Sequence, residues 1–316
     1  MNLKRIVKYI ICVSPKFLRA IINKKIEQRE IKEARKRIAR TKVSKSEVLD
    51  LINKLDVDCD VMLHSSMMNI GKMQIGIKGI CEALFKRINL DKNTLLVSAL
   101  PFRGRFLDYL NDGPIFDVRN APIAMGAINE RIAMMPNVCR SIHPTHSVVA
   151  IGRSREYYTN THHVDATPFG LNSPYYKLIK NRGKVILFGA TLNNLTCIHA
   201  IEDMLGDAFP VKIYYKKRFN VKCIDNNGCE IMVKTPCHNP MVGVRRDLLP
   251  LKEHALNAGA MRVFPMGESE FAIIDMYKFT LFYLAYIKNG NSIYGKIKVT
   301  DKLKSRIKEL ETELKK

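Results

Sequence analysis

Short apolar segments alternate with longer helical patterns through the middle of this chain, and this alternation is what most limits the folds that it can adopt. Residues 61–63, 94–100 and 184–188 have the continuous apolar character of buried strands, whereas residues 75–88 repeat apolar side chains at helical spacing. Strands that alternate with helices pack as a sheet covered by helices, so we expect an α/β protein. Residues 213–233 read as two strands around an Asn-Asn-Gly turn, which predicts an antiparallel hairpin.

The two ends of the chain are far more basic than its middle. The formal net charge is +22, of which residues 1–45 contribute +12, from 15 Lys and Arg against three Glu, and residues 296–316 contribute +4. The remainder carries about +6, an ordinary value for a soluble enzyme. We therefore predict a basic amphipathic helical extension over residues 1–44, a globular domain over residues 45–294 and a basic C-terminal helix over residues 295–316.

The N-terminal extension combines apolar and basic side chains in one pattern. Its apolar residues recur at helical spacing, with Lys and Arg between them, and are Leu3, Ile6, Val7, Ile10, Phe17 and Ile21. One interpretation is that residues 1–25 lie on an anionic membrane surface. The other is that a pair of helices packs on the globular domain or against a second copy in a homodimer. The sequence leaves both open.

Other features of the sequence predict where the chain acts and what it does not bind. No apolar run reaches the roughly 18 to 20 residues of a spanning helix, no secretory signal is evident, and eight single cysteines show no paired spacing. We expect a cytoplasmic protein, with peripheral association at the inner membrane face under the membrane interpretation. Residues 1–45 contain only Tyr9 and Phe17 as aromatic residues, so we do not expect nucleic-acid binding.

Two stretches have the composition of site walls. The strand at residues 61–63 runs into His64, Ser65 and Ser66, where backbone amides and hydroxyl groups suit an anion. Residues 116–152 hold Pro, Gly and His at irregular spacing, which is typical of a loop-rich site. The histidines there have no third ligand at a recognisable spacing, so we expect no metal.

A third stretch carries the strongest chemical signal. The predicted strand at residues 184–188 leads through a loop into a helix on which His199 and Glu202 are three residues apart. They share one helix face, so the carboxylate can fix the tautomer of the imidazole and raise its basicity. That arrangement suits a general base, although a histidine on an apolar helix is also a common core residue.

Seven blocks in order resemble the aminoglycoside 3-N-acetyltransferase family, also called the antibiotic N-acetyltransferase family. The blocks are HSSM at 64–67, FDxxxxPxxxG at 116–126, INE at 128–130, RSxHPxxS at 140–147, PFGxxSP at 168–174, GKVILFGA at 183–190 and TxxHxxE at 196–202. The resemblance covers about residues 45–290 and omits both basic ends. It implies a mixed central sheet with flanking helices, and transfer of the acetyl group of acetyl-CoA to an amine without a metal.

The resemblance also implies roles for individual residues. Those in the coenzyme-binding block are His64, Ser65 and Ser66. Those in the catalytic block are Thr196, His199 and Glu202, with the histidine as the base. Those implied to line the acceptor are Asp117, His143, Ser147 and Asp247. The chain departs from the family in having Leu195 where an asparagine is usual and Lys78-Gly79 in place of a double glycine.

The acceptor is a separate question from the reaction. Aminoglycosides are polycations and require an acidic pocket, whereas the middle of this chain has no acidic excess. We therefore expect an amino sugar that carries negative charge, namely a nucleotide- or lipid-linked amino sugar of surface polysaccharide synthesis. The alternatives are an aminoglycoside 3-N-acetyltransferase that confers antibiotic resistance and a non-catalytic protein that binds membrane surfaces or nucleic acid.

Overall fold

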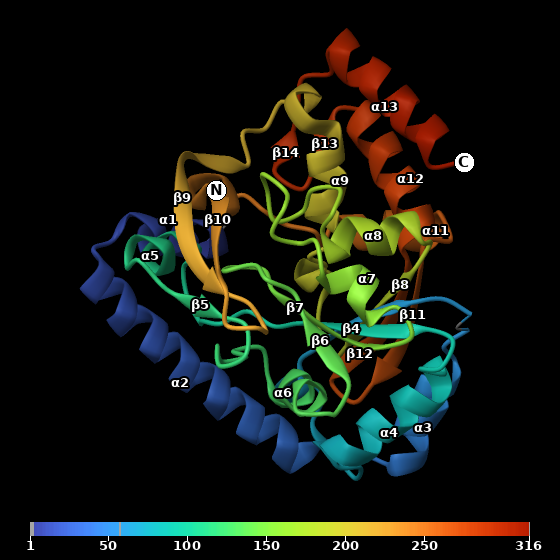
Figure 1. The fold of residues 1–316 in the computed structure, drawn as a ribbon. Helices are drawn as coiled ribbons and strands as arrows, with labels where there is room; N and C mark the ends of the chain where they lie inside the picture. The colour runs from blue at the N-terminus through green and yellow to red at the C-terminus, as the bar shows by residue number, and fades with distance from the viewer. Residues whose placement is uncertain (1–2, 57, 316) are drawn as a thin grey trace.

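The computed structural model describes residues 3–56 and 58–315 and is built around one twisted sheet (Figure 1). The seven strands of this sheet occur in the spatial order β11-β12-β8-β2-β4-β7-β6. In that order they are Met261–Met266, Ser269–Asp275, Lys184–Phe188, Val61–Ser65, Thr94–Ser98, Val148–Gly152 and Val138–Arg140. The central strands β8, β2 and β4 are parallel to one another. On one side β12 pairs antiparallel with β8 and β11 with β12, and on the other β7 pairs antiparallel with β4 and β6 with β7. The predicted mixed central sheet is therefore confirmed.

The register of the sheet brings polar residues to one edge. Ser65, at the end of β2, lies opposite Phe188, at the end of β8, and Ser98, at the end of β4, lies opposite Val148, at the start of β7. The carboxyl ends of parallel strands are the usual place for a ligand in an open α/β sheet. This edge is where the predicted site residues follow their strands.

Helices cover both faces of the sheet. Successive strand residues point to opposite faces, so Met62 belongs to one apolar core and Leu63 to the other. The helices that line the first core are α7 Arg155–Thr159, α8 Pro174–Lys180, α9 Ile198–Leu205, α11 Leu251–Asn257, α12 Met276–Lys288 and α13 Asp301–Glu313. Those that line the second are α3 Lys45–Asn53, α4 Ile77–Ile88 and α6 Ala127–Ala133.

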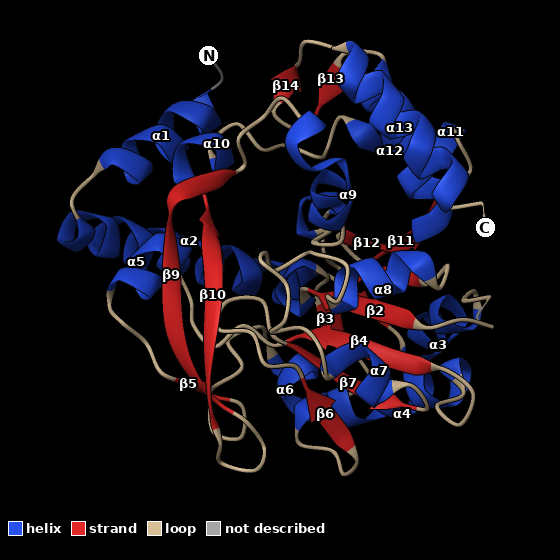
Figure 2. Cartoon of the chain, turned by 45° about the horizontal axis from the view of Figure 1, so that its top comes forward, coloured by secondary structure: helices blue, strands red, loops and turns tan. Residues whose placement is uncertain are grey.

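A second, three-stranded sheet stands beside the main one (Figure 2). It consists of the long antiparallel pair β9 Tyr214–Ile224 and β10 Glu230–His238, with the short strand β5 Phe116–Asp117 paired to β9. This confirms the predicted hairpin, whose turn contains Gly228 at a φ of +84°, a backbone conformation that favours glycine. The sheet has its own small apolar core, to which α5 Phe106–Asn111 contributes Leu107 and Leu110, and α10 Pro240–Gly243 follows the end of β10.

Two N-terminal helices lie on the outside of the molecule. α1 Leu3–Val13 and the long α2 Lys16–Arg40 meet at a break around Ser14 and Pro15, and α2 runs along one side of the structure (Figure 1). Ion pairs fix α2 to the rest of the chain, among them Arg19 Nη2 to Asp108 Oδ1 at 2.8 Å and Arg40 to Glu268. The helix is thus held on one face and exposed on the other.

Local sequence signals account for several element boundaries. The Ser44 hydroxyl accepts from the Glu47 amide at 3.1 Å while the Glu47 carboxylate accepts from the Ser44 amide at 2.7 Å, which forms a capping box at the start of α3. The predicted helix at residues 75–88 begins two residues later, at Ile77, because Gly76 is extended.

The remaining elements are short. They are the paired strands β1 Lys42–Val43 and β3 Lys72–Met73, the paired strands β13 Asn291–Ser292 and β14 Gly295–Lys296, and the 3-10 helices η1 Met67–Asn69, η2 Leu192–Asn194 and η3 Gly206–Ala208. Among the described residues, none of the helices combines the length and the apolar character needed to cross a membrane. The division into parts at residues 44 and 294 stays a prediction.

Candidate active site

His199 and Glu202 form a buried pair at the edge of the main sheet. β8 ends at Phe188, and a loop then leads through η2 into α9, whose first turn contains His199. The loop approaches the end of β2 closely at Gly189, where a Cβ atom would lie 2.7 Å from the Ser66 carbonyl oxygen. His199 Nδ1 lies 2.7 Å from Glu202 Oε2, and both side chains are buried. The predicted pairing on one helix face is present.

Glu202 is held in place from two directions besides His199. The Tyr294 hydroxyl donates to Oε2 at 3.1 Å, and the Tyr283 hydroxyl on α12 donates to Oε1 at 3.3 Å. Burial raises the pKa of the Glu202 carboxyl to about 8, while these hydroxyl donors and the charge of Arg246 act in the opposite direction. The Glu202 carboxyl group therefore has fixed partners that orient Oε2 to accept a hydrogen bond from His199 Nδ1.

Arg246 occupies the other side of the imidazole. Its Nε–H donates to His199 Nε2 at 3.2 Å, and its Nη1 donates to the Asn193 carbonyl oxygen at 2.9 Å. Burial and the charge of Arg246 hold the pKa of His199 well below its ordinary value. His199 is therefore a neutral imidazole at neutral pH, with its proton on Nδ1 and its lone pair on Nε2. The sequence analysis singled out the adjacent Asp247, not Arg246.

His199 is one of several histidines packed together in the interior. Its ring centroid lies 4.5 Å from that of His238 on β10, and the rings of His143 and His162 are 4.6 Å apart. Burial is the main cause that lowers the pKa of each of these rings and of His146. They are neutral at physiological pH and act as polarisable, hydrogen-bonding core side chains.

Two of these histidines are already fully engaged. His143 Nδ1 accepts from the His146 amide at 3.1 Å, which fixes its orientation within the loop. His162 lies 2.9 Å from both the Ser141 hydroxyl and the Pro168 carbonyl oxygen. Among residues 3–56 and 58–315, no group of three or more metal-ligating side chains has the arrangement of a metal site. The cluster therefore supports the wall of the site through hydrogen bonds.

The residues predicted for the coenzyme lie at the sheet edge in different environments. His64 is buried and, by strand alternation, faces the same side of the sheet as Met62. That side is covered by α9, because the Sγ of Cys197, just before α9, lies 3.7 Å from Met62 Sδ. The Ser65 hydroxyl donates to Asn129 Oδ1 at 3.4 Å. The Ser66 amide and hydroxyl already pair with the Phe188 carbonyl and Asn69.

Three buried polar atoms near this edge have no hydrogen-bond partner within the described part of the chain. They are His64 Nε2, Ser98 Oγ and His238 Nε2. Such atoms are uncommon in folded proteins because burial without a partner costs on the order of 1 to 3 kcal/mol. The first two lie near the carboxyl ends of strands β2 and β4, and the third lies on the ring that contacts His199. Polar atoms of a bound ligand would satisfy them.

The other predicted residues are dispersed, and Asp117 lies opposite Ile224, at the end of β9 away from Tyr214, whose ring packs on His238 beside His199. Thr196 is half-buried three residues before His199, and its hydroxyl donates to the Asn194 carbonyl oxygen at 3.3 Å. The Ser147 hydroxyl donates to the Ser141 carbonyl oxygen at 2.8 Å. Asp247 accepts from the Leu249 amide at 3.2 Å. Asp117, on the second sheet, is engaged by Arg119 at 2.9 Å.

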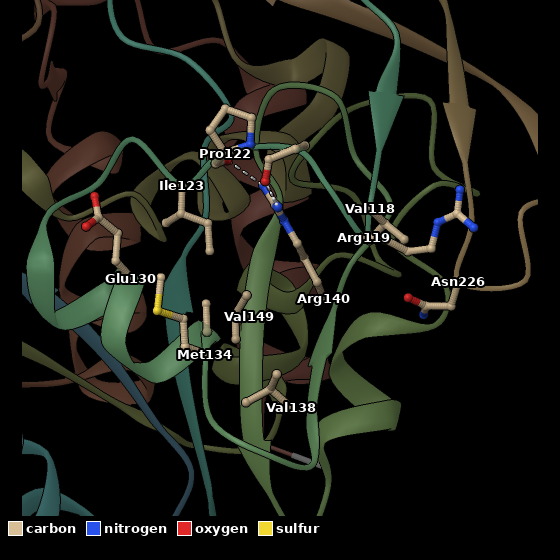
Figure 3. Close-up of a pocket in the computed structure, with 12 residues that line it drawn as sticks. Val118, Arg119, Pro122, Ile123, Glu130, Met134, Val138, Arg140, Val149 and Asn226 are labelled. Carbon is tan, nitrogen blue, oxygen red and sulfur yellow. Dashed lines mark hydrogen bonds between the residues drawn. The ribbon is translucent and has the colours of Figure 1, made fainter.

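A pocket of about 520 Å³ lies between α6, β6 and the loop after β5 (Figure 3). Among the side chains that line it are Arg119, Ile123, Glu130, Met134 and Arg140. The half-buried Arg140 guanidinium connects this pocket to the interior, since it donates to the Ala99 carbonyl at 2.8 Å and to the Ser147 hydroxyl at 3.2 Å.

Sequence reasoning missed Arg246, Tyr283 and Tyr294, although each bonds directly to the His199–Glu202 pair. The only signal for Arg246 was its place next to Asp247 in a segment already singled out. The tyrosines gave no signal, because they lie 81 and 92 residues after Glu202 and reach it only through tertiary packing.

Comparison with known proteins gives one consistent result. The family model described as aminoglycoside 3-N-acetyltransferase matches residues 62–288. The aminoglycoside N(3)-acetyltransferase III of Pseudomonas aeruginosa is 29% identical over 153 residues, which are 45% of this chain and 56% of that relative. A prophage-derived aminoglycoside N(3')-acetyltransferase-like protein of Bacillus subtilis (strain 168) is 28% identical over 212 residues, 62% of this chain and 71% of its own length. The match thus spans little more than half of the Pseudomonas enzyme.

Solved structures match over more of the chain. A structure titled as the binary complex of AAC-IIIb with CoASH has a TM-score of 0.63 at 22% identity and covers 78% of this chain and 97% of its own. Aminoglycoside acetyltransferase AAC(3)-Xa has a TM-score of 0.64 at 22% identity, covering 84% and 98%. At these identities the likeness shows the fold.

Proposed function

The chain belongs to the aminoglycoside 3-N-acetyltransferase family, and we propose that it transfers the acetyl group of acetyl-CoA to the amine of an amino sugar. The observation that carries this proposal is the buried contact of 2.7 Å between His199 Nδ1 and Glu202 Oε2. An amine is mostly protonated at neutral pH and cannot attack until a base removes its proton. A neutral imidazole with a fixed tautomer is suited to accept that proton at Nε2.

The residues at the sheet edge fit acetyl-CoA as the second substrate. His64 Nε2 and Ser98 Oγ, which have no partner in the described part of the chain, offer positions for polar groups of a ligand, and the Ser65 hydroxyl, half-buried on the opposite face of β2, makes one long hydrogen bond. A solved relative of the same fold is titled as a complex with CoASH. Acetyl-CoA supplies an acetyl group activated as a thioester. In this proposal His64, Ser65 and Ser66 hold the coenzyme, and Thr196 is placed to donate to the reacting carbonyl.

Two lines of support point to different acceptors. The relatives are named for aminoglycosides, and this supports the antibiotic-resistance alternative better than a role in polysaccharide synthesis. The charge of the chain supports an anionic amino sugar, nucleotide- or lipid-linked, because the half-buried Arg246 adjoins the base and the middle of the chain has no acidic excess. Asp117, His143, Ser147 and Asp247 are proposed to line the acceptor. A non-catalytic binding protein would leave the buried His199–Glu202 pair without a role.

A screen of acceptors tests this proposal directly. We expect release of CoA thiol from acetyl-CoA when the protein is given nucleotide-linked or phosphorylated amino sugars, with weaker turnover of aminoglycosides. The measurement is a thiol-release assay over the three classes, with mass spectrometry to identify the acetylated amine. Faster turnover of an aminoglycoside would establish the resistance alternative, and the absence of thiol release with every class would contradict the proposed activity.

The exposed face of α1 and α2 supports a peripheral contact with an anionic membrane. Phe17 is 70% exposed, and Ile10, Val13 and Ile21 are at least half exposed. The basic side chains exposed along α2 beside this apolar face are Lys24, Lys25, Lys32, Arg35 and Lys36. Ion pairs to Asp108 and Glu268 fix α2 to the rest of the chain, so this face stays exposed. Apolar groups flanked by cations match an anionic lipid surface.

Replacing Phe17 and Ile21 together by glutamate removes this contact. Each large apolar side chain contributes roughly 1.5 to 3 kcal/mol when buried, so we expect at least about a hundredfold weaker binding to vesicles that contain anionic lipid. Both positions are exposed, so the fold and acetyl transfer to a soluble acceptor should be retained. Co-sedimentation with vesicles measures the effect, with Tyr157→Glu, an exposed position on α7, as the matched control.

The same variants distinguish the competing occupant of this face. If the wild type is a homodimer through α2, analytical ultracentrifugation without lipid will show that the Phe17 and Ile21 substitutions dissociate it. That result, or equal sedimentation of both variants with the vesicles, would contradict the membrane contact.

A further inference from the structure

Among the residues that the structure describes, Arg246 is the one guanidinium that touches the proposed base. It lies on the loop between α10 and α11, and Asn193 fixes this loop to the loop that precedes α9. The Asn193 carbonyl accepts from Arg246 Nη1 at 2.9 Å, and the Asn193 side-chain oxygen accepts from the Leu248 amide at 2.8 Å. Arg245, the preceding residue, is exposed. Only the second of the two adjacent arginines is therefore directed at the site.

The contact of Arg246 with His199 has a direct chemical consequence. A lone pair on Nε2 that accepts a hydrogen bond from a guanidinium cannot at the same time accept a proton from an amine. The arginine must leave Nε2 before the base can act. Nothing in the contact is strong enough to prevent this, since a 3.2 Å bond from a cation to a neutral imidazole lacks the charge pairing of an arginine with an anion.

Arg246 lacks a fixed anionic partner in the described part of the chain. Its hydrogen bonds go to an imidazole and a backbone carbonyl, and its Nη2 has no acceptor there. The carboxyl groups nearest to it are Glu202, which is occupied by His199 and two tyrosines, and Asp247, which accepts from a backbone amide. A half-buried guanidinium without a carboxylate partner is a binding point for an anion.

We propose that Arg246 is a positioning residue that caps Nε2 of His199 until an anionic group of the acceptor, a phosphate or carboxylate close to the reacting amine, draws the guanidinium away. The inference rests on the proposed acetyltransferase function and names the acceptor class of that site. A phosphate accepts two hydrogen bonds from the planar fork of arginine, which an imidazole cannot do. An anionic acceptor thus gains binding and releases the base in one event, whereas a polycation meets a positive charge at the base.

The first experiment measures the coupling without any turnover. In protein with ¹⁵N-labelled histidine, the His199 signal, identified by its loss in His199→Gln, is titrated in the wild type and in two variants. Arg246→Gln removes the charge beside the ring, so the pKa of His199 rises. Arg245→Gln removes the same charge from the exposed neighbour and leaves that pKa unchanged. The other charged or titratable groups that face the ring are Glu202 on α9, His238 on β10 and His146 in the loop before β7, and they are the same in all three proteins. Equal values in the two variants would overturn the inference.

The second experiment tests the acceptor class. It compares kcat/KM for an amino sugar that carries a phosphate with that for the same amino sugar without it. We expect the wild type and Arg245→Gln to prefer the phosphorylated sugar by at least about tenfold, and Arg246→Gln to lose the preference. In Arg246→Gln the acidic limb of the pH profile with the neutral sugar should also move to higher pH.

The two experiments separate the possible failures. If the wild type prefers a polycationic aminoglycoside, or if Arg246→Gln keeps the preference for phosphate, the inference is overturned while the acetyltransferase function stands. If no acceptor is acetylated, both the proposed function and the proposed acceptor class are contradicted. The histidine titration then still decides whether Arg246 lowers the pKa of His199.

Discussion

Replacing His199 by alanine is expected to lower kcat by about two to four orders of magnitude and to leave the affinity for acetyl-CoA nearly unchanged. A general base acts in the transition state and contributes little to binding in the ground state, so the loss belongs to kcat. The buried imidazole that accepts at Nε2 and donates from Nδ1 to Glu202 is the only group in the site with this combination of contacts among the described residues. Steady-state kinetics with saturating substrates, together with calorimetric titration of CoA, measure the two effects.

Glu202→Gln provides the comparison for this prediction. The amide keeps one acceptor oxygen for His199 Nδ1 and the Tyr294 hydroxyl and places its NH2 group against the Tyr283 hydroxyl, but it cannot ionise to the carboxylate that stabilises a protonated imidazole. We expect a smaller loss than in His199→Ala. Circular dichroism and the thermal midpoint check that each variant is folded. A folded His199→Ala protein with wild-type turnover would show that another group is the base.

Local chemistry explains what could be predicted from the sequence. The pairing of His199 with Glu202 follows from a spacing of three residues on one helix, and the capping box at Ser44 follows from a spacing of three residues at a helix start. The hairpin around Gly228 follows from its turn residues. In each case the partners are neighbours in the chain, so the geometry of a single element is enough to place them.

Long-range packing explains what could not be predicted. Arg246 lies 47 residues after His199, and Tyr283 and Tyr294 reach Glu202 from α12 and from the loop before β14. No periodicity links such positions; they meet because the helices on one face of the sheet pack around α9. The same packing leaves His64 Nε2 without a partner among the described residues, a fact that strand alternation alone does not reveal.

The buried histidines also predict how the stability of the protein depends on pH. Burial lowers the pKa of six imidazoles, to about 4 for His64 and about 3 for His162, and well below the usual range for the other four, which are His143, His146, His199 and His238. In the unfolded chain each takes up a proton near pH 6.5. The stability that they contribute is therefore complete above pH 6.5 and is lost as the pH falls towards the folded pKa values.

Two buried carboxyl groups act with the opposite sign. Burial raises the pKa of Glu202 to about 8 and that of Asp203 to about 7, so in the folded protein they bind protons at a pH where the unfolded chain does not. Each group changes the free energy of unfolding by at most about 1.4 kcal/mol per pH unit while the two states differ by one proton. Six imidazoles outnumber two carboxyl groups, so the free energy of unfolding decreases as the pH falls from 6.5 to 4.5.

Urea unfolding at pH 7.5, 6.5, 5.5 and 4.5 measures this slope. We expect the free energy of unfolding to change little between pH 7.5 and 6.5 and to fall by several kcal/mol over the next unit. His254, an exposed residue of α11 outside the cluster, provides the control, since His254→Gln should keep the full slope. His162→Asn removes one buried imidazole and should reduce the slope of the free energy of unfolding by about 1.4 kcal/mol per pH unit, the contribution of one proton. Stability that is constant or rises from pH 6.5 to 4.5 would mean that the cluster takes up protons in the folded state, and the neutral His199 required for proton abstraction would then be in doubt as well.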